Sequence, residues 1–432
     1  MGLFLLLPVM SILGQGLEGA TPLLIGVALG IYGLFQAALQ IPFGLMSDHF
    51  GRKRVIYAGL AMLVAGSIVA AVADTIWGVI AGRALQGAGA ISAAVMALAA
   101  DLSRDDQRTK MMAIIGAAIG LSFVLSMMIG PLLMSRLGLS GIFIAIAFSG
   151  VASALLVRFA VPEQSASDVS VNRDYSANTT QLGAVIRNPE LLRLDIGILL
   201  LHLLITATFV CVPLGLVERG IAPETHWKVY LLACLLSLFI MVPLIGLSEK
   251  GVRHVMIISI VGLGLAEIFI GLTGQNWWMI VTAIGIFFGF LNVLESMLPS
   301  MVSRIAPVGS RGSAMGVYSS SQFMGAFIGG VFGGWMVGAI GVATAHVVLG
   351  VLSFFWLLII RKMKEPEKLG SYQLSLRGVS GYDQELLEQQ LGAIEGVEEV
   401  NVIEADNVAY LKVRRNTLDQ QNLHNCLANY HS

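Results

Sequence analysis

The chain has 432 residues, of which 56% are hydrophobic and 12% are charged. About 25% of residues are charged in an average soluble domain, so this composition excludes a disordered chain, a nucleic-acid binder and a secreted disulfide-rich domain. The mean hydropathy of +0.80 predicts a protein that crosses a membrane many times. Of the 26 basic and 27 acidic residues, eighteen lie in Lys362–Ser432, which predicts a soluble tail after the membrane body.

Long apolar stretches predict the membrane-crossing helices, because about 20 apolar residues are needed to cross about 30 Å of hydrocarbon. Six stretches lie within residues 1–161 and six within 191–361, and the polar residues 162–190 between them are predicted to form a linker. The first stretch would span only about 24 Å, so we expect that the true start lies upstream or that the protein is truncated. The twelve stretches are Gly2–Leu17, Pro22–Ser47, Val55–Ala73, Trp77–Ala100, Met111–Met134, Ser140–Val161, Leu191–Leu216, Trp227–Leu247, Val255–Leu272, Trp277–Met301, Ala314–Val337 and Val342–Ile360.

The distribution of Lys and Arg predicts the orientation of these helices. Eighteen basic residues lie in the even-numbered loops, the linker and the segment after the last span, whereas the opposite side has only Arg136, Arg219 and Lys228. Cytoplasmic loops retain basic residues. Both termini and the linker are therefore predicted to be cytoplasmic.

The two groups of helices resemble each other. Residues 101–111 and 302–315 share a pattern of Ser, Arg and Met about 200 residues apart, and Ser-Asp at 47–48 corresponds to Ser-Glu at 248–249. Two similar six-helix halves in parallel orientation predict a carrier whose binding site lies near the midplane between them.

After Pro366 the pattern changes to that of a small α+β domain, predicted at 371–432. Its order of elements, βαββα, is typical of a ferredoxin-like domain. The loop Arg377–Gly381 has no cysteine, so we do not expect it to capture a soft metal. The expected elements are Tyr372–Leu376, Asp383–Ile394, Val397–Ile403, Val408–Val413 and Thr417–Asn429, with a hairpin-like turn at Glu404–Asn407.

The loop after the second span reads GLMSDHFGRKR at 44–54. It resembles G-x-L-x-D-x-x-G-R-[KR], the signature of the major facilitator superfamily between its second and third helices. The resemblance implies twelve transmembrane helices in two six-helix bundles. The fold class is therefore predicted to be an all-α membrane protein with a small C-terminal α+β ferredoxin-like domain.

The same motif implies a conformational latch. Gly44 would let another helix approach closely, and Gly51 would permit a sharp turn. Asp48 lies at the C-terminal end of its helix, where the helix dipole disfavours a carboxylate, so it needs a nearby cation or the N-terminus of another helix. The resemblance implies that the eleventh helix supplies that N-terminus and that Arg52 joins Asp48 to Asp101 in the outward-facing state. The alternative is a loop whose charges are only solvated.

Two further motifs lie in the first half. The run GRALQGAG at 82–89 resembles the second motif of the family, which implies that Arg83 faces the cavity and takes part in proton transfer. The alternative is an arginine that extends to the membrane interface. Gly130 and Pro131 resemble part of the antiporter motif G-x-x-x-G-P-x-x-G-G, which implies helix bending and antiport. The alternative is an ordinary kink.

Two ionisable residues in the second half are candidates for proton coupling or for the substrate cavity. Glu295 lies well inside the tenth span and His202 inside the seventh. A carboxyl group away from water favours its neutral form, so Glu295 could carry a proton at neutral pH. The alternative for Glu295 is a structural bond to Asn292, a serine or Arg304. Glu267 lies in the ninth span, which is peripheral in this family, so we expect it to have a structural partner.

These features resemble the drug:proton antiporter-type facilitators that carry a cytoplasmic C-terminal domain. The resemblance implies a monomeric exporter in the bacterial inner membrane, which exchanges protons for small amphipathic compounds by alternating access. Its expected partners are the small-molecule substrate, protons and the lipid bilayer, with no nucleic acid, cofactor or metal and no enzymatic activity. The tail is a candidate binding domain for an unidentified ligand or protein. A uniporter or symporter of a small metabolite, and a transporter-derived sensor acting through its tail, remain as alternatives.

Overall fold

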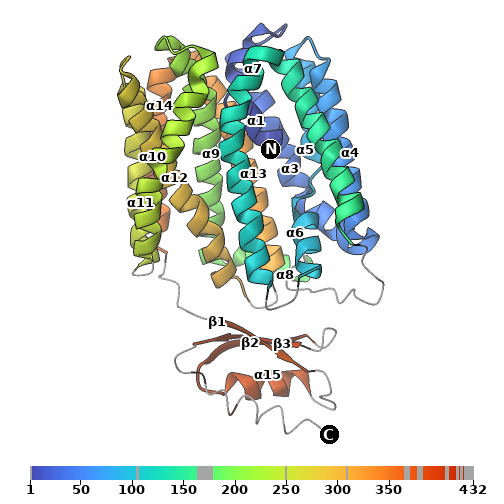
Figure 1. Ribbon diagram of the computed structural model, residues 1–432. Coiled ribbons are helices and arrows are strands. Elements are labelled where there is room, and N and C mark those ends of the chain that lie inside the picture. Colours follow the sequence, from blue (N-terminus) through green and yellow to red (C-terminus); the bar gives the residue numbers. More distant parts are fainter. Residues whose placement is uncertain are drawn as a thin grey trace.

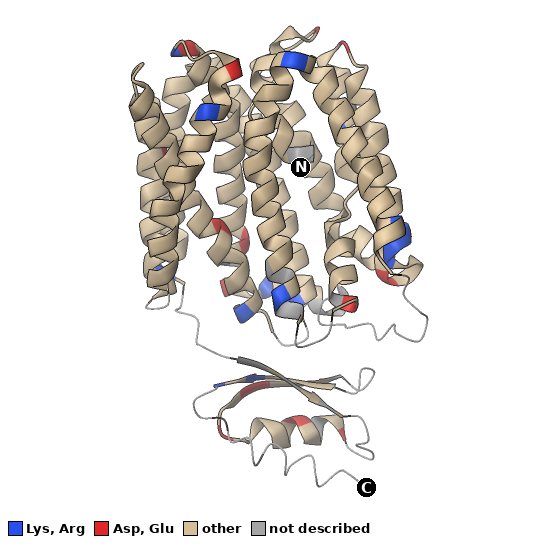
Figure 2. Cartoon of the chain, in the orientation of Figure 1, with Lys and Arg blue, Asp and Glu red and all other residues tan. Residues whose placement is uncertain are grey.

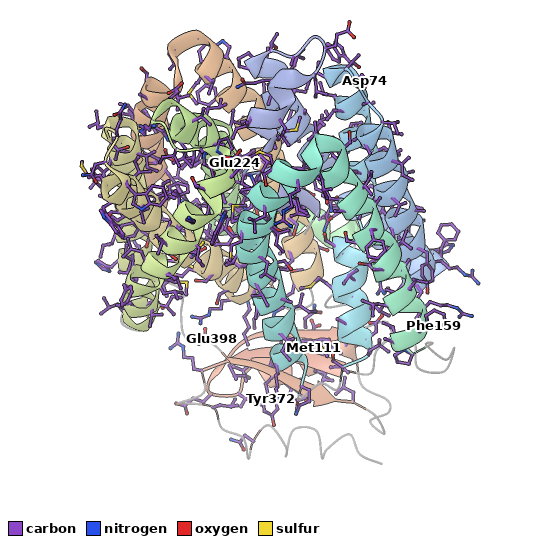
Figure 3. All side chains as sticks on the ribbon, turned by 45° about the horizontal axis from the view of Figure 1, so that its top comes forward. Asp74, Met111, Phe159, Glu224, Tyr372 and Glu398 are labelled. Carbon is purple, nitrogen blue, oxygen red and sulfur yellow. The ribbon has the colours of Figure 1, made fainter. Side chains whose placement is uncertain are left out.

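The protein consists of a body of long helices and a small tail domain (Figure 1). The computed structural model describes residues 2–103, 107–162, 179–248, 251–307, 310–363, 370–376, 383–403, 408–414, 418 and 422. We call the end of the body nearer the tail domain the tail side and the opposite end the far side. Asp74 and Glu224 lie at the far side, whereas Met111 and Phe159 lie towards the tail side (Figure 3).

The first half of the body begins with two short helices, and its longest helix is broken. Thr21 and Thr75 cap α3 and α5 by accepting hydrogen bonds from the backbone N–H groups of Leu24 and Gly78, which satisfies donors that a helix start leaves unpaired. Two predicted spans lie in α7, where Gly138 has non-helical angles of φ 63° and ψ −164°. Figure 1 shows α7 turning back at the far side. The helices are α1 (Gly2–Leu6), α2 (Met10–Leu13), α3 (Pro22–Phe50), α4 (Arg52–Ala71), α5 (Ile76–Ala88), α6 (Ser92–Asp101) and α7 (Arg108–Ala160), with a 3-10 turn, η1 (Gly14–Gly16).

The second half repeats the pattern with unbroken helices. Asn188 and Asn276 cap α9 and α12 in the same way as the threonines of the first half. Across the described residues, ten helices are long and apolar enough to cross a membrane. Counting both limbs of α7 and the short α1–α2 region, all twelve predicted spans are helical, so the predicted fold class is confirmed. The helices are α8 (Thr179–Arg187), α9 (Pro189–Glu218), α10 (His226–Ser248), α11 (Val252–Leu272), α12 (Trp277–Ile305), α13 (Arg311–Ile340) and α14 (Val342–Ile360), with η2 (Pro223–Thr225) before α10.

Glycines let α13 pack closely between α3 and α9. A Cβ atom added at Gly26 or Gly30 of α3 would collide with the backbone of α13, and one added at Gly325 or Gly329 of α13 would collide with the backbone of α9. Small residues that allow such close approach stabilise helix pairs in membranes, where burial from water contributes little. The glycine repeat of the eleventh predicted span therefore holds together helices from both halves.

Aromatic side chains form a second contact between the halves. Phe123 of α7 lies 6.1 Å from Phe209 of α9 and 6.0 Å from Phe288 of α12, measured between ring centroids. Ser11 of the first half also donates a hydrogen bond to the Phe209 carbonyl oxygen. Charged residues lie mainly at the two ends of the body and on the tail domain (Figure 2), so few of them lie in the interior.

The tail domain is a three-stranded antiparallel sheet with one helix. The strand order is β1-β3-β2, and the leucine and valine side chains of the sheet and of α15 form a separate core. The sheet lies between α15 and the helical body (Figure 1). The predicted turn Glu404–Asn407 lies outside the described residues, and of the predicted helix Thr417–Asn429 only Leu418 and Asn422 are described. The elements are β1 (Gly370–Ser375), α15 (Gln384–Gly392), β2 (Val397–Ile403) and β3 (Val408–Val413).

Candidate transport site

Three polar side chains from three helices of the second half meet in the interior of the body. His202 of α9 lies with Nε2 3.2 Å from Oε2 of Glu295 on α12. Gln322 of α13 places its amide nitrogen 2.7 Å from the same Nε2 and donates to Oε1 of Glu295 at 3.2 Å. The side chains of His202 and Glu295 are 17% and 43% exposed, so water reaches the cluster.

The hydrogen bonds of this cluster depend on how many protons it holds. Nε2 of His202 can donate one hydrogen when it is protonated or accept one when it is not. In the first case it donates to the carboxylate of Glu295, and in the second it accepts from Gln322 or from a protonated Glu295. One added proton therefore rearranges contacts among α9, α12 and α13.

The partners of Glu295 differ from those considered in the sequence. Neither Asn292 nor Arg304 forms its hydrogen bonds in the described part of the chain; His202 and Gln322 do. Gln322 was missed, because it lies 120 residues from His202 and a lone glutamine in an apolar span has no motif around it. The polar run Ser319–Gln322 within the eleventh span was the available signal.

Arg83 of α5 is buried and does not extend to the membrane interface. Its side chain donates to the backbone carbonyl oxygens of Ala28 and Leu29 on α3, at 3.2 and 3.3 Å. It also donates to Oε1 of Gln86 at 2.8 Å, and its guanidinium lies 4.9 Å from the ring centre of Tyr32. The residue is 1% exposed. This geometry ties α5 to the part of α3 that packs on α13.

The rest of the same motif packs α5 against α3 and α4. Gln86 donates to Oγ of Ser67 on α4 at 2.7 Å. A Cβ added at Gly82 would lie 2.6 Å from the Gly66 carbonyl oxygen of α4, and one added at Gly87 would collide with the backbone of Tyr32 on α3. The glycines therefore allow the close approach that brings Arg83 to the α3 carbonyl groups.

The residues of the expected latch lie together where α3, α4 and α6 meet. Arg52 donates from Nε to Oδ2 of Asp101 at 3.1 Å, pairs through Nη1 with Asp48 and donates to Oγ of Ser47 at 2.8 Å. Arg52 is 6% exposed. The alternative of a loop with merely solvated charges therefore does not describe this arginine.

The glycines of the first half differ in what they permit. Gly51 has a φ of 93°, a backbone conformation that favours glycine, at the sharp turn between α3 and α4. At Gly44 an added Cβ would lie 3.5 Å from Ala93, which is an ordinary contact, so the expected need for close helix approach is not seen here. Gly130 lies where an added Cβ would be 2.9 Å from the Leu5 carbonyl oxygen, and Pro131 follows it inside α7.

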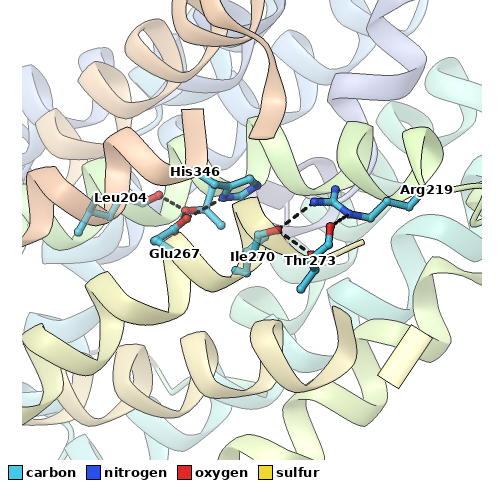
Figure 4. A network of polar contacts seen from close by, with 7 residues as sticks. Leu204, Arg219, Glu267, Ile270, Thr273 and His346 are labelled. Atoms are coloured by element: carbon cyan, nitrogen blue, oxygen red, sulfur yellow. Dashed lines mark hydrogen bonds and ion pairs between the residues drawn. The ribbon is translucent and has the colours of Figure 1, made fainter. Parts of the chain in front are cut away.

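A second polar network lies apart from this site, deeper in the second half. Glu267 of α11 bonds His346 Nδ1 of α14 at 2.7 Å and also contacts Oγ1 of Thr208 on α9, which donates to the Leu204 carbonyl oxygen (Figure 4). Glu267 and His346 are both 0% exposed. Glu267 therefore has the structural partner expected of it, and this network joins three helices away from water.

The described residues contain no group of three or more His, Cys, Asp or Glu side chains placed to hold a metal ion. The site consists instead of one histidine, one carboxyl group and one amide, with Arg83 and the latch in the other half. Such groups can exchange protons and hydrogen-bond a small molecule.

Comparison with known proteins identifies the family. The chain matches the family described as Major Facilitator Superfamily over residues 1–250 and 222–381. It is 40% identical to the inner membrane transport protein YajR of Escherichia coli (strain K12), covering 96% of this chain and 91% of that protein. It is 25% identical to the multidrug resistance protein MdtH of Klebsiella pneumoniae (strain 342), covering 87% of this chain and 94% of that protein. The human organic anion transporter MFSD10 (TETRAN) has the same fold, with a TM-score of 0.60 at 20% identity over 83% of this chain and 95% of that one. The chain therefore belongs to the major facilitator superfamily and is a multi-pass inner-membrane transporter.

Proposed function

We propose that the protein is a proton-coupled exporter that exchanges protons for small amphipathic compounds by alternating access. The His202–Glu295–Gln322 cluster carries this proposal, because binding or loss of one proton changes its hydrogen bonds on three helices. A group that couples protons to a substrate must be reached by both, and the 43% exposure of the Glu295 side chain meets that requirement.

Protonation and substrate binding would compete at this cluster. When Glu295 is charged, its carboxylate and the amide of Gln322 can hydrogen-bond a polar group of the substrate. When a proton binds, the cluster satisfies its own hydrogen bonds and its attraction for that group weakens. Mutually exclusive occupancy of this kind links two opposite fluxes, as an antiporter requires.

The direction and the substrate class rest on relatives and on the aromatic contact between the two halves. MdtH is named a multidrug resistance protein and MFSD10 an organic anion transporter, and both names favour organic substrates. The interior around Phe123, Phe209 and Phe288 is aromatic, which suits an apolar body better than a sugar. We further propose that the tail side is cytoplasmic, as the basic loops predict.

Alternating access would use the packing of α3 on α13 and the Arg52 latch. The two halves meet closely along α3 and α13, so rocking of the halves must change this contact. Arg52 binds Asp48 and Asp101 within the first half, where it can hold their charges in the arrangement that the other half recognises. Arg83 would keep α3 straight against α5 during the movement.

Transport into liposomes tests the proposal. With the tail side outward, an acidic interior should drive uptake of ethidium or fluorescein, chosen as an amphipathic cation and an amphipathic anion. Glu295→Gln should abolish the stimulation by the pH gradient, whereas Glu224→Gln, at an exposed far-side position, should leave it unchanged. Gradient-driven uptake by Glu295→Gln at the wild-type rate would refute the role of Glu295.

The two alternatives give different results in simple variants of this assay. A symporter would be driven by acid outside the vesicle instead of inside, and a uniporter would ignore the gradient. A sensor would keep transport but lose a downstream response when residues 371–432 are deleted.

A further inference from the structure

A second carboxyl group lies inside the membrane body, on the tail side of the transport site. Asp195 is on α9, seven residues before His202, and two helical turns place it on the same face about 10 Å away. The residue is 5% exposed. Asp195 belongs to the seventh predicted span, but no motif points to it.

Asp195 lacks the partners that buried acids normally have. Within the described part of the chain it forms no hydrogen bond or ion pair with another residue. The carboxyl oxygens of Asp195 are nevertheless not fully enclosed by protein atoms, so solvent reaches them. An ionisable residue inside a membrane span is expensive to keep and is usually functional.

The contrast with Glu267 shows what this arrangement permits. Glu267 is 0% exposed and is bonded by His346 and Thr208, so it has no access to water and a fixed set of partners. Asp195 has access to water and no fixed partner. Only the second arrangement lets a carboxyl group gain and lose a proton during a transport cycle.

Tyr318 connects Asp195 electrostatically with the transport site. It is 3% exposed, lies one helical turn before Gln322 on α13, and interacts with the charges of both Glu295 and Asp195. Gln322 in turn contacts Glu295. Tyr318 therefore interacts with two carboxyl groups, that of Asp195 on α9 and that of Glu295 on α12.

Among the residues that the structure describes, no side chain of another element forms a hydrogen bond or an ion pair with Asp195. Trp356 of α14 lies against Gly197, two residues after Asp195 on α9. Of the titratable groups in the described part of the chain, Tyr318 on α13 interacts electrostatically with Asp195, and His202 lies two turns further along α9.

We propose that Asp195 is a second proton-binding group of the transporter beside Glu295, so that each cycle moves two protons instead of one. The proposal rests on the proposed function, in which Glu295 binds the first proton. No covalent step is involved. Each carboxylate takes one proton from water on one side of the membrane and returns it to water on the other.

The ratio of proton to substrate flux tests this inference. Liposomes containing the full chain, with a pH dye inside, should show two protons exchanged per ethidium molecule in the wild type. Asp195→Asn should lower the ratio to one while substrate counterflow, which needs no net proton movement, continues at a similar rate. Glu224→Gln should leave the ratio at two. Failure of counterflow would indicate a folding defect, in which case Asp195→Glu should restore both counterflow and the ratio of two.

Infrared difference spectra separate a proton-binding role from a structural one. On acidification of the purified protein, the carbonyl band of protonated carboxyl groups should lose one component in Asp195→Asn and a different one in Glu295→Gln. An unchanged flux ratio and an unchanged band in Asp195→Asn would overturn the inference. If the wild type moves no protons at all, the proposed function itself fails, and this outcome is distinct from the first.

Discussion

The contact of α3 with α13 predicts a large effect from one added methyl group. In Gly330→Ala the new Cβ would lie 2.5 Å from the Gly26 carbonyl oxygen and 3.0 Å from Cα of Gly30. Ordinary contact begins near 3.4 Å, so the two helices must separate by about 0.9 Å at this point. Both obstructing atoms belong to the backbone and cannot rotate away.

The magnitude follows from the cost of overpacking. Inserting a methyl group into a well-packed contact costs about 1–3 kcal/mol, and part of that loss comes from dispersion, which falls by a quarter to a half when a gap of 0.5–1 Å opens. If the packed state of α3 and α13 alone is destabilised, its population relative to the separated state should fall about 5- to 150-fold.

A disulfide at the far-side end of the same contact measures that population. A Cβ added at Gly338 would lie 3.6 Å from Cβ of Pro22. In a double variant with Pro22→Cys and Gly338→Cys, the two cysteines should therefore form a disulfide rapidly under mild oxidation when the helices are packed. Adding Gly330→Ala should slow cross-linking by the factor given above. Gly246→Ala is the control, because its Cβ would meet no atom within 4 Å. Equal cross-linking with and without Gly330→Ala would refute the reasoning.

Three other substitutions test the remaining interactions. Arg52→Ala removes the guanidinium that joins two acidic side chains, and it should lower substrate counterflow in liposomes about 5- to 150-fold. Arg52→Lys should recover part of that counterflow. Counterflow at the wild-type rate in Arg52→Ala would contradict a latch. His346→Leu removes the imidazole that bonds the buried carboxyl group of Glu267 and should destabilise the protein by about 3–5 kcal/mol in thermal unfolding. Adding Glu267→Met should restore stability, and a double variant as unstable as the single one would argue against a stabilising contact between Glu267 and His346. Asp383→Ala removes the side-chain cap of α15 and should cost about 1 kcal/mol, seen as faster hydrogen exchange of the first α15 amides only.

The boundaries of many elements could be read from local sequence. The strands β2 and β3 have the bounds that their β-branched runs predict, and α15 begins directly after its capping residue Asp383. These predictions succeed because hydrophobic period, chain length and caps are properties of neighbouring residues. The break at Gly138 lies between the two spans predicted for α7, where the apolar run is interrupted.

The candidate site could be predicted only in part. Glu295 and His202 stood out because an ionisable residue inside a membrane span is conspicuous in the sequence. Their pairing with Gln322 could not be predicted from the sequence. The three residues lie on helices that are distant in the chain and meet only through the packing of α9, α12 and α13. Tyr318 was missed for the same reason, since a tyrosine in an apolar span is ordinary until its neighbours are known.

The sequence by itself determined the class of protein, the number of spans and the family. Hydropathy acts over about 20 consecutive residues, and the signature at 44–54 is a local pattern, so neither depends on the fold. Tertiary structure alone decided which charges are paired. It surrounds Glu267 with His346 and Thr208 and brings Arg83 to the carbonyl groups of α3. It leaves Asp195 in contact with solvent and, among the described residues, without a hydrogen-bond or ion-pair partner. The physical reason is that the energy of a charge in a membrane depends on the atoms within a few ångströms of it, and those atoms come from distant parts of the chain.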